Sequence, residues 1–367
     1  MSEWKEYKFS DIAEVIGGGT PDTFNVSYWN GDIPWLTPKD LTGYSKIYIS
    51  KGERNITSDG LKNSSAKLLP KDTVLLTTRA PIGYVAIAEN EIATNQGFKN
   101  FVLKKDYADC KFVYYWLKNN IDYLRSIGTG TTFAEISGSV VKEIKILLPP
   151  LSEQKSIASI LSSLDDKIDL LHRQNATLEK MAETLFRQWF IEDAKEEWEI
   201  AKMESLISIG SGKGLKKESF IENGLYPILG ANGEIGRTNE FIFDEKLIYT
   251  GRVGTLGNIF RIENEKVWLS DNTLVIKPLG FFNFIYFTLK NSHLEDYDVG
   301  STQPLIRQSD IKEIEVVLPP IEILKEFESI ANKVFQKIKS NQTQIRTLTA
   351  LRDTLLPKLM SGEIRVL

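Results

Sequence analysis

The stretch VKEIKILLPP at Val141–Pro150 returns as IKEIEVVLPP at Ile311–Pro320, 170 positions later in the chain. Each copy follows a segment with β-rich patterns and leads directly into a long helical pattern. Two globular segments, each followed by a long helix, predict an internal pseudo-twofold symmetry. Such a molecule suits a binding partner that is itself roughly twofold, and duplex DNA is the obvious example.

The first globular segment, residues 1–150, has the short strands and frequent turns expected of an α+β domain. Asp72–Arg79 and Tyr84–Ala88 are predicted strands, because both are apolar runs rich in β-branched residues. Phe112–Leu124 has its large apolar residues spaced as on one buried side of a helix. Gly17–Pro21 is a predicted turn.

The second globular segment, residues 196–320, follows the same pattern. We align Leu247–Arg252 with Val74–Arg79, Leu269–Thr273 with Ala93–Gly97, and Gly300–Gln303 with Gly130–Phe133. The offset between the copies drifts by a few residues, as insertions and deletions in surface loops would cause.

The first long helix, residues 151–195, is predicted from apolar residues that recur in alternating steps of three and four, the spacing of a coiled-coil seam. They are Ile157, Leu161, Leu164, Ile168, Leu171, Leu178, Ala182, Leu185 and Trp189. Ser152 is the expected N-cap residue, with Glu153 in the first turn. Asn175 interrupts the seam. Either it lies between the helices and fixes their register, or the helix is rotated there and Asn175 faces water.

The second long helix, residues 321–367, has its own apolar seam. The seam residues are Phe327, Ile330, Val334, Ile338, Ile345, Leu348, Leu355 and Leu359. Pro357 is expected to kink or end this helix, with Ser361-Gly362 as the stop. Helices of about 35–40 residues are about 50–60 Å long. We expect the two helices to pack antiparallel as a coiled coil, with a globule at each end.

Composition limits the classes of protein to consider. The formal net charge of −4 predicts weak non-specific DNA binding by the chain taken whole, because DNA affinity comes largely from Lys and Arg against phosphate. Either the basic residues cluster on one face, or a partner supplies much of the contact. The single cysteine, Cys110, excludes internal disulfide bonds and fits a reducing cytoplasm. We expect no signal peptide, and no membrane span, since the longest apolar run, near Leu279–Leu289, is too short.

Motifs for catalysis are incomplete. Gly210–Gly214 lacks the first glycine and the Ser or Thr of a phosphate-binding loop. With His172 and His293 as the only histidines, a histidine-based metal site or catalytic triad is excluded. Glu143-Ile144-Lys145 fits the Glu-x-Lys element of some nucleases, but its repeat is Glu313-Ile314-Glu315, which favours a solvated strand face. Neither Pro-Pro pair lies in the Asp/Asn-Pro-Pro-aromatic loop of an adenine methyltransferase.

Three segments together resemble the specificity subunits of type I restriction-modification systems. They are LPPLSEQ at Leu148–Gln154, TRAPIG at Thr78–Gly83 and LRDTLLPKLMSGEI at Leu351–Ile364. The resemblance covers essentially the whole chain. The second copy departs from it at Ile321–Ile323, where the Ser-Glu-Gln signature is lost but the order of strand and helix is kept.

The resemblance implies that residues 1–150 and 196–320 are two target recognition domains, each reading one half of a split DNA sequence in the major groove. It implies that the helices at 151–195 and 321–367 set the spacing and dock two modification subunits, which bind S-adenosylmethionine and methylate adenine N6. Restriction subunits that use ATP and Mg are implied to join them.

The chain itself is then expected to be a non-catalytic cytoplasmic protein that holds no cofactor or metal. Two alternatives stay open. One belongs to the enzyme class: either the detached recognition portion of a larger methyltransferase-nuclease, or a cryptic nuclease that uses Glu143 and Lys145. The other is a coiled-coil adaptor that does not bind DNA.

The candidate DNA contacts are donor-rich side chains, small residues that allow close backbone approach, and Lys or Arg that can hold phosphate. In residues 1–150 they are Gly18, Gly19, Thr20, Lys39, Thr78, Arg79, Thr94, Asn95, Gln96, Thr129, Thr131 and Thr132. In residues 196–320 they are Lys213, Lys216, Lys217, Asn232, Arg252, Ser270, Asp271, Asn272, Ser301, Thr302 and Gln303. The alternatives are turn formation for the polar residues and a solvated charge run for the lysines.

Arg79 and Arg252 take matched positions after buried strands in the two alignments. If they contact DNA, a shared position favours phosphate holding over base reading. A structural ion pair is the alternative. The candidate contacts to partner subunits are Leu151, Glu153, Gln154, Ile157, Leu161, Leu185, Leu355 and Leu359.

Overall fold

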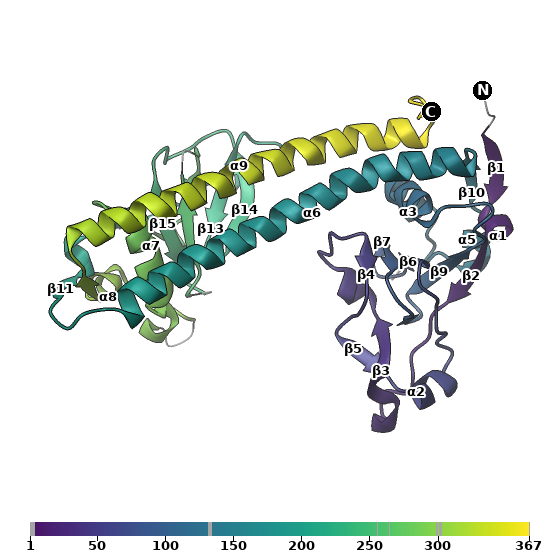
Figure 1. Ribbon diagram of the computed structural model, residues 1–367, viewed down its shortest axis with the longest axis horizontal. Helices are drawn as coiled ribbons and strands as arrows, with labels where there is room; N and C mark the ends of the chain where they lie inside the picture. The colour runs from purple at the N-terminus through teal and green to yellow at the C-terminus, as the bar shows by residue number, and fades with distance from the viewer. Residues whose placement is uncertain are drawn as a thin grey trace. The chain divides into compact units, whose positions relative to one another are not determined.

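The computed structural model describes residues 4–130, 134–254, 256–263, 265–298, 300 and 303–366. The chain divides into two compact units: Met1–Arg173 with Gln342–Leu367, here unit 1, and Gln174–Asn341, here unit 2. Each unit contains one β-rich globule and parts of two long helices (Figure 1). The predicted α+β class, with two β-rich globules, is confirmed.

The globule of unit 1 is built on a five-stranded sheet of order β2-β9-β6-β7-β4 and a three-stranded sheet of order β5-β3-β8. The strands are β2 (Ala13–Gly17), β3 (Trp29–Leu36), β4 (Tyr48–Ile49), β5 (Arg54–Ile56), β6 (Val74–Thr78), β7 (Ile82–Ala88), β8 (Ala93–Thr94) and β9 (Phe98–Leu103). The helices of this globule are α1 (Phe9–Ile12), α2 (Ser58–Lys62), α3 (Cys110–Asn119), α4 (Ile121–Ser126) and α5 (Gly138–Glu143). Every residue of β6 is buried, as expected for a strand covered on both faces.

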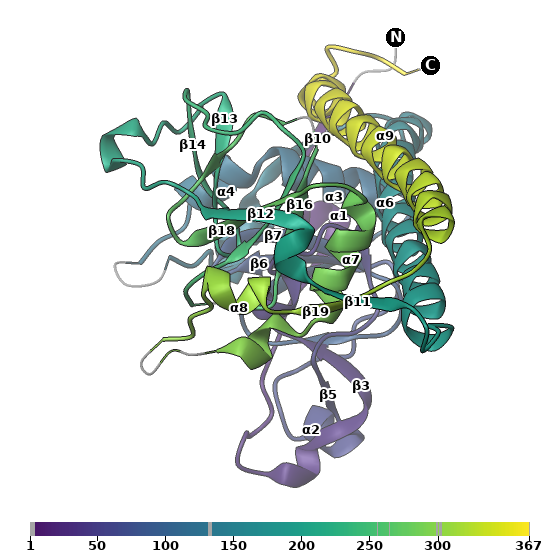
Figure 2. The same ribbon diagram turned by 90° about the vertical axis from the view of Figure 1, so that its left-hand side faces the viewer.

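The globule of unit 2 repeats this plan with a four-stranded sheet, β12-β18-β15-β16, and a three-stranded sheet, β14-β13-β17 (Figure 2). The strands are β12 (Ile207–Ser211), β13 (Tyr226–Gly230), β14 (Gly233–Thr238), β15 (Leu247–Gly251), β16 (Ile259–Ile262), β17 (Trp268–Leu269) and β18 (Thr273–Pro278). The helices are α7 (Phe282–Asn291) and α8 (Gln308–Lys312). The apolar run near Leu279–Leu289 becomes α7, whose aromatic residues fill the core of the unit.

A short antiparallel strand pair closes each globule. β1 (Lys5–Lys8) pairs with β10 (Lys145–Leu148), and β11 (Glu199–Lys202) pairs with β19 (Glu315–Leu318). β10 and β19 lie within the repeated stretches of the sequence, each between a short helix and the Pro-Pro pair. Lys8 Nζ lies 2.6 Å from Glu143 Oε2, and Lys202 Nζ lies 2.5 Å from Glu313 Oε2, so the two copies carry the same exposed ion pair. Glu143 lies at the end of α5 and not on a strand face as predicted, and its exposed carboxylate is used in this ion pair.

The long helices are α6 (Leu151–Arg187) and α9 (Ile321–Met360), and each contributes to both units. In unit 1, Glu153 near the start of α6 pairs with Arg365 after the end of α9. Asp165, further along α6, pairs with Arg352, which lies earlier in α9. One helix therefore runs opposite to the other within this unit.

Unit 2 contains the second part of α6 and the first part of α9, again antiparallel. Phe186 and Phe327 pack with ring centroids 5.9 Å apart, and Asn341 Nδ2 donates to Asn175 Oδ1 at 2.9 Å. Asn341 is fully buried. Asn175 therefore lies in the seam between the helices, which settles the alternative that its sequence position left open. The partner residue, Asn341, falls in the gap of the second apolar pattern between Ile338 and Ile345.

Polar side chains join the globule of unit 1 to the helices. The Tyr115 hydroxyl on α3 donates to Asp165 Oδ2 at 2.6 Å, and Arg352 Nη1 lies 2.7 Å from Asp165 Oδ1. Burial and the nearby Asp165 carboxylate raise the pKa of Tyr115 well above its usual range, so the phenol stays a donor. One carboxylate thus connects α3, α6 and α9.

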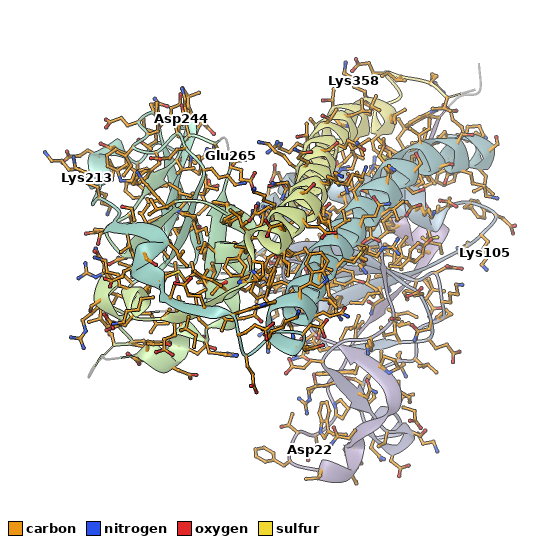
Figure 3. The ribbon with its side chains drawn as sticks, turned by 60° about the vertical axis from the view of Figure 1, so that its left-hand side comes forward. Asp22, Lys105, Lys213, Asp244, Glu265 and Lys358 are labelled. Carbon is orange, nitrogen blue, oxygen red and sulfur yellow. The ribbon has the colours of Figure 1, made fainter. Side chains whose placement is uncertain are left out.

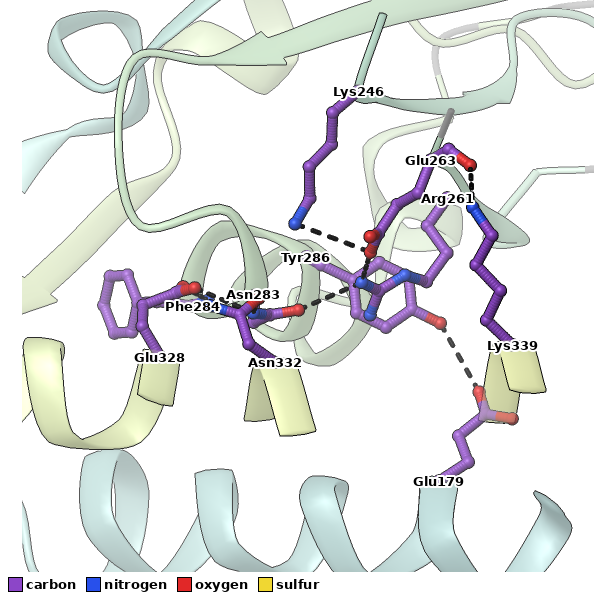
Figure 4. A network of polar contacts seen from close by, with 10 residues as sticks. All are labelled: Glu179, Lys246, Arg261, Glu263, Asn283, Phe284, Tyr286, Glu328, Asn332 and Lys339. Atoms are coloured by element: carbon purple, nitrogen blue, oxygen red, sulfur yellow. Dashed lines mark hydrogen bonds and ion pairs between the residues drawn. The ribbon is translucent and has the colours of Figure 1, made fainter. Parts of the chain in front are cut away.

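In unit 2 a larger network of polar side chains joins the globule to the long helices (Figure 4). The Arg261 guanidinium of β16 lies 3.2 Å from the centroid of the Phe335 ring of α9 and also contacts Glu263. Burial lowers the pKa of Arg261 to about 10, which leaves the guanidinium charged at neutral pH. Its Nη2 donates to Asn283 Oδ1 at 3.1 Å. The network therefore joins the sheet to α7 and α9.

The N-terminus of α7 is capped by a residue from α9. Phe281 precedes α7 and offers no capping side chain. Instead Glu328 Oε1 accepts from the Phe284 N–H at 2.9 Å, and Glu328 Oε2 accepts from Asn283 Nδ2 at 2.7 Å. A carboxylate at this end is also favoured by the helix dipole. Because the capping residue lies on α9, formation of α7 is coupled to the packing of the globule against α9.

One prediction about a helix end is wrong, and another is confirmed. α6 begins at Leu151, so Ser152 lies inside its first turn, and the Pro150 carbonyl accepts from the Gln154 N–H at 3.0 Å. α9 passes through Pro357 and continues to Met360, and the predicted stop at Ser361-Gly362 is confirmed, with a φ of +74° at Gly362.

The predicted helix at Phe112–Leu124 is also corrected, because the structure has two helices there. Asn120 ends α3, and its side-chain amide donates to the Trp116 carbonyl at 2.8 Å. This side-chain bond competes with the backbone hydrogen bonds that would extend α3, so the chain changes direction at Asn120 before α4 begins.

The Asn175–Asn341 contact predicts an unusual stability effect. The double variant Asn175→Leu/Asn341→Leu should unfold at higher denaturant concentration, by about 1–2 kcal/mol, because an apolar seam is more stable than a polar one. Asn341→Ala alone should lower stability by about 1–3 kcal/mol, since it removes the donor to Asn175. Chemical denaturation checks both. Gln344→Leu, at an exposed position of α9, is the matched control. A double variant less stable than the parent contradicts the expectation.

The cap supplied by Glu328 gives a second expectation. Glu328→Ala should lower the stability of unit 2 by about 1–3 kcal/mol, because two buried donors at the start of α7 lose their acceptor. Glu326→Ala, at an exposed position of the same helix, should change stability by less than about 0.5 kcal/mol. Hydrogen exchange of the α7 amides would localise the effect, and equal losses in the two variants would refute the cap.

Candidate nucleic-acid interface

In each unit, a glycine-containing loop follows an edge strand of the main sheet and crosses a polar turn. In unit 1 the loop follows β2, and the Gly19 N–H donates to the Thr94 carbonyl at 2.8 Å. A Cβ on Gly18 would lie 2.0 Å from the Asn95 carbonyl oxygen, so this crossing requires glycine. In unit 2 the loop follows β12, and a Cβ on Gly212 would lie 2.1 Å from the Ser270 carbonyl oxygen.

An indole N–H completes the arrangement in both units. Trp35 Nε1 donates to the Gly19 carbonyl at 2.9 Å, and Trp268 Nε1 donates to the Lys213 carbonyl at 2.7 Å. The two tryptophans come from different strands, β3 and β17. We call the loop, the turn and the indole bond the loop-turn frame. The two units build the same frame with different residues.

The frame of unit 1 exposes three of the predicted side chains. Thr20 and Asn95 are half-buried and Gln96 is exposed, and Thr20 Oγ1 donates to Gln96 Oε1 at 2.5 Å. Asn95 Oδ1 accepts from the Gly97 N–H at 2.9 Å, which holds the turn. These side chains lie together on one surface and offer amide and hydroxyl groups to a ligand.

Three other predicted contacts in unit 1 are corrected, because their residues are buried. Thr94 has no exposed surface, and its hydroxyl accepts from Asn100 Nδ2 at 2.9 Å. Thr78 is equally buried within β6, and Gly19 is a buried residue of the loop itself, packed against Ser65 and Ala66. They support the frame and are not available to DNA. Periodicity alone does not separate them from their exposed neighbours.

The frame of unit 2 exposes charge as well as amides. Lys213, Asp271 and Asn272 are exposed, and Figure 3 labels Lys213. Ser270 is only 8% exposed, and its hydroxyl has no hydrogen-bond partner among the described residues. A cavity of about 380 Å³ lies beside this turn; it is lined by Gly214, Leu215, Lys216, Phe220, Ile228, Ile235, Ser270, Asp271 and Asn272.

Arg79 and Arg252 do not take matched positions. The Thr78 N–H donates to the Gly97 carbonyl, and the equivalent bond in unit 2 runs from the Arg252 N–H to the Asn272 carbonyl. Arg252 is therefore the counterpart of Thr78. Because successive residues of a strand point to opposite faces, this one-residue shift removes the argument that both arginines share one role.

The surroundings of the two arginines also differ. Arg79 Nη1 lies 3.9 Å from Glu135 Oε2, and Lys99 Nζ lies 3.8 Å from Glu135 Oε1. Such a partly exposed pair contributes about 0–1 kcal/mol, so it does not prevent Arg79 from binding another anion. Arg252 is exposed and forms no ion pair with the described residues.

The other predicted contacts are scattered. Lys39 Nζ pairs with Glu53 Oε2 at 2.9 Å, and Asn232 Oδ1 accepts from Asn258 Nδ2 at 2.8 Å. Thr129 forms a β-bridge with Glu135, while Lys217 and Gln303 are exposed. Four predicted contacts, Thr131, Thr132, Ser301 and Thr302, lie outside the described residues.

The predicted contacts to partner subunits are mostly used inside the chain. Gln154 is 1% exposed, accepts from the Asp109 N–H at 3.0 Å and donates to the Tyr107 carbonyl at 2.9 Å. Four others are buried in unit 1: Glu153, Ile157, Leu161 and Leu359. This corrects their assignment, because a partner cannot reach them. Leu151, Leu185 and Leu355 are half-buried.

Sequence patterns did not point to Arg54, which lies near the frame of unit 1. Its guanidinium carbon is 3.5 Å from the centroid of the Trp29 ring. Arg54 lies on a three-residue strand in which no apolar alternation singles it out. Only the pairing of β3 with β5 brings it beside the two tryptophans Trp29 and Trp35.

The described part of the chain contains no group of three or more His, Cys, Asp or Glu side chains placed to hold a metal ion. None of its helices combines the length and the apolar character that a bilayer crossing requires.

A family model described as the type I restriction modification DNA specificity domain matches residues 1–180 and 195–350. The MjaIX specificity subunit of a type I restriction enzyme from Methanocaldococcus jannaschii is 38% identical over 99% of this chain and 94% of its own length. The EcoprrI specificity subunit of Escherichia coli is 25% identical over 92% of this chain and 91% of its own.

A solved structure has the same fold. The S subunit of a type I restriction-modification system from M. genitalium superposes with a TM-score of 0.64 at 22% identity, covering 98% of this chain and 96% of that one. The family model covers both repeats, and the relative from M. jannaschii spans nearly the whole chain. The chain therefore belongs to the family of type I restriction-modification specificity subunits.

Proposed function

We propose that each unit reads one half of a bipartite DNA target with the surface around its loop-turn frame. The observation that carries this proposal is a common frame with different exposed side chains. Unit 1 presents Thr20 and Gln96, and unit 2 presents Lys213, Asp271 and Asn272. Amides, carboxylates and lysine read base edges by their hydrogen bonds, so unlike sets fit unlike half-sites.

The long helices have a separate task in this proposal. They set the number of unread base pairs between the half-sites, and they dock two modification subunits that bind S-adenosylmethionine and methylate adenine N6. Restriction subunits that use ATP and Mg join this complex, and this chain is the non-catalytic recognition subunit. The net charge of −4 supports a division of labour in which partners contribute phosphate contacts.

Exposed apolar residues of α6 and α9 are better docking candidates than the buried ones. Met181 is 58% exposed, Leu351 is 45% exposed, and Ile160 and Leu170 are also exposed. Apolar side chains exposed on a helix lower the free energy when a partner covers them. We assign the partner contact to these four residues together with Leu151, Leu185 and Leu355.

The direct test is selection from randomised duplexes. The chain, co-purified with a modification subunit that binds it, should enrich two short sequence blocks separated by a fixed unread spacer. Enrichment of a single block, or of none, would contradict the bipartite proposal. Binding of the modification subunit without any DNA preference would instead favour an adaptor.

Single variants in the two frames should act on separate half-sites. Gln96→Ala should weaken discrimination at one position of the first block by roughly 5- to 150-fold, and Asn272→Ala should do the same in the second block. Each variant controls for the other, because each should leave the opposite block unchanged. A joint loss in both blocks would point to unfolding or to a shared phosphate contact.

Lengthening both helices tests the spacing role. Seven residues inserted after Leu171 in α6 and seven before Ile345 in α9 add about 10.5 Å to each helix. At about 3.4 Å per base pair, the preferred spacer should grow by about three base pairs while both blocks stay the same. Insertion into α6 alone is the control, since it shifts the seam and should impair binding. Changed blocks with an unchanged spacer would refute the spacing role.

A further inference from the structure

Arg54 is held in a defined orientation by two tryptophans in the small lobe of unit 1. This lobe consists of the β5-β3-β8 sheet, α2 and the turn at Val26–Tyr28. The Arg54 guanidinium carbon lies 3.5 Å from the Trp29 ring centroid and 5.8 Å from that of Trp35. The two rings are buried and pack edge to face with centroids 5.1 Å apart. The indoles thus form a rigid support for an exposed cation.

Arg54 is exposed, and its guanidinium makes no hydrogen bond or ion pair with the described residues. The adjacent carboxylate, Glu53, is instead paired with Lys39 at 2.9 Å. A guanidinium stacked on an aromatic face keeps its N–H groups along its edge, in the fork that matches two adjacent acceptors. Little side-chain entropy is then lost when a ligand binds.

The same lobe is continuous with the loop-turn frame and carries unusual exposed apolar residues. Trp35, which supports Arg54, also donates to the Gly19 carbonyl of the frame. Phe24 is 94% exposed and Val26 is 77% exposed. Their loop is ordered by Asp22, whose carboxylate accepts from the Phe24 N–H at 3.0 Å; Figure 3 labels Asp22. Apolar side chains fit thymine methyl groups and base edges, and do not suit phosphate.

Unit 2 lacks this arginine at the corresponding position. Trp35 pairs with Arg54 across β3 and β5, and its counterpart Ile228 pairs with Gly236 across β13 and β14. A Cβ on Gly236 would lie 2.7 Å from the Phe220 ring, so an aromatic side chain covers this place. The next residue, Arg237, has its donors in use: Nε lies 2.8 Å from the Gly224 carbonyl oxygen and Nη1 lies 3.1 Å from Glu234 Oε1.

We propose that Arg54 reads a guanine in the half-site of unit 1, through paired hydrogen bonds from its guanidinium to guanine O6 and N7. This inference rests on the proposed function and names one element of the sequence read. A phosphate contact is needed equally at both half-sites, whereas a residue that reads a base differs between units. Arg54 and Gly236 differ in this way. The guanine edge offers the two adjacent acceptors that the free fork of Arg54 fits.

The test uses the full-length chain with its modification subunit and the same randomised duplexes. Arg54→Met keeps an apolar stem over Trp29 but removes the donors, and Arg54→Lys keeps the charge but loses the paired geometry. Both should lose a guanine preference at one position of the first block, by roughly 5- to 150-fold, with the second block and the spacer unchanged. Lys51→Ala, an exposed cation three positions earlier, should leave that preference intact.

Three results would overturn the proposal. The first is uniform weakening across all sequences with a shallower salt dependence, which marks a phosphate contact. The second is retention of the guanine preference by Arg54→Met, which has no donor. The third is a loss explained by a lower melting temperature of Arg54→Met, which marks a purely structural stack. If the unaltered chain selects no blocks at all, the proposed function fails instead, so the two failures are distinguishable.

Discussion

The antiparallel pairs β1–β10 and β11–β19 are the constraint on which the rest of the molecule depends. Each pair joins the first strand of a globule to the strand that leads into a long helix. Pro149-Pro150 and Pro319-Pro320 follow these strands and lack N–H donors, so strand pairing stops there. A helix can start at this point with fewer unsatisfied donors. The globule is therefore closed where its helix begins, and this stretch has to stay alike in both copies.

Main-chain bonds leave the recognition surface free to diverge. The Gly19 to Thr94 bond of unit 1 and the Lys213 to Leu269 bond of unit 2 join the same two backbone positions, each at 2.8 Å. Neither bond depends on a side chain beyond the glycine that precedes it. Exposed residues around the frame can therefore change without refolding the unit, which is the requirement for two domains of one fold to read different sequences.

Pattern analysis of the sequence recovers what periodicity and duplication control. The strands near Val74 and Tyr84, both long helices and the polar interruption at Asn175 are all found where they were predicted. Pattern analysis fails where a prediction depends on the exact alignment or burial of a single residue. The alignment of Arg79 with Arg252 is off by one position, and Thr94 is buried although its neighbours are exposed. Arg54 leaves no local signal, because the tryptophans that orient it arrive through strand pairing.

A chain with a net charge of −4 has to separate affinity for DNA from discrimination between sequences. Affinity depends mainly on the number of phosphate contacts, which partner subunits can supply. Discrimination depends on a few donors held in place before binding, because a mobile side chain loses entropy that offsets the gain from its hydrogen bonds. The stack of Arg54 on Trp29 and the bond between Thr20 and Gln96 meet this second requirement without adding much charge. In the proposed function, changing such residues would therefore alter the sequence that is read while keeping the phosphate contacts that partner subunits supply.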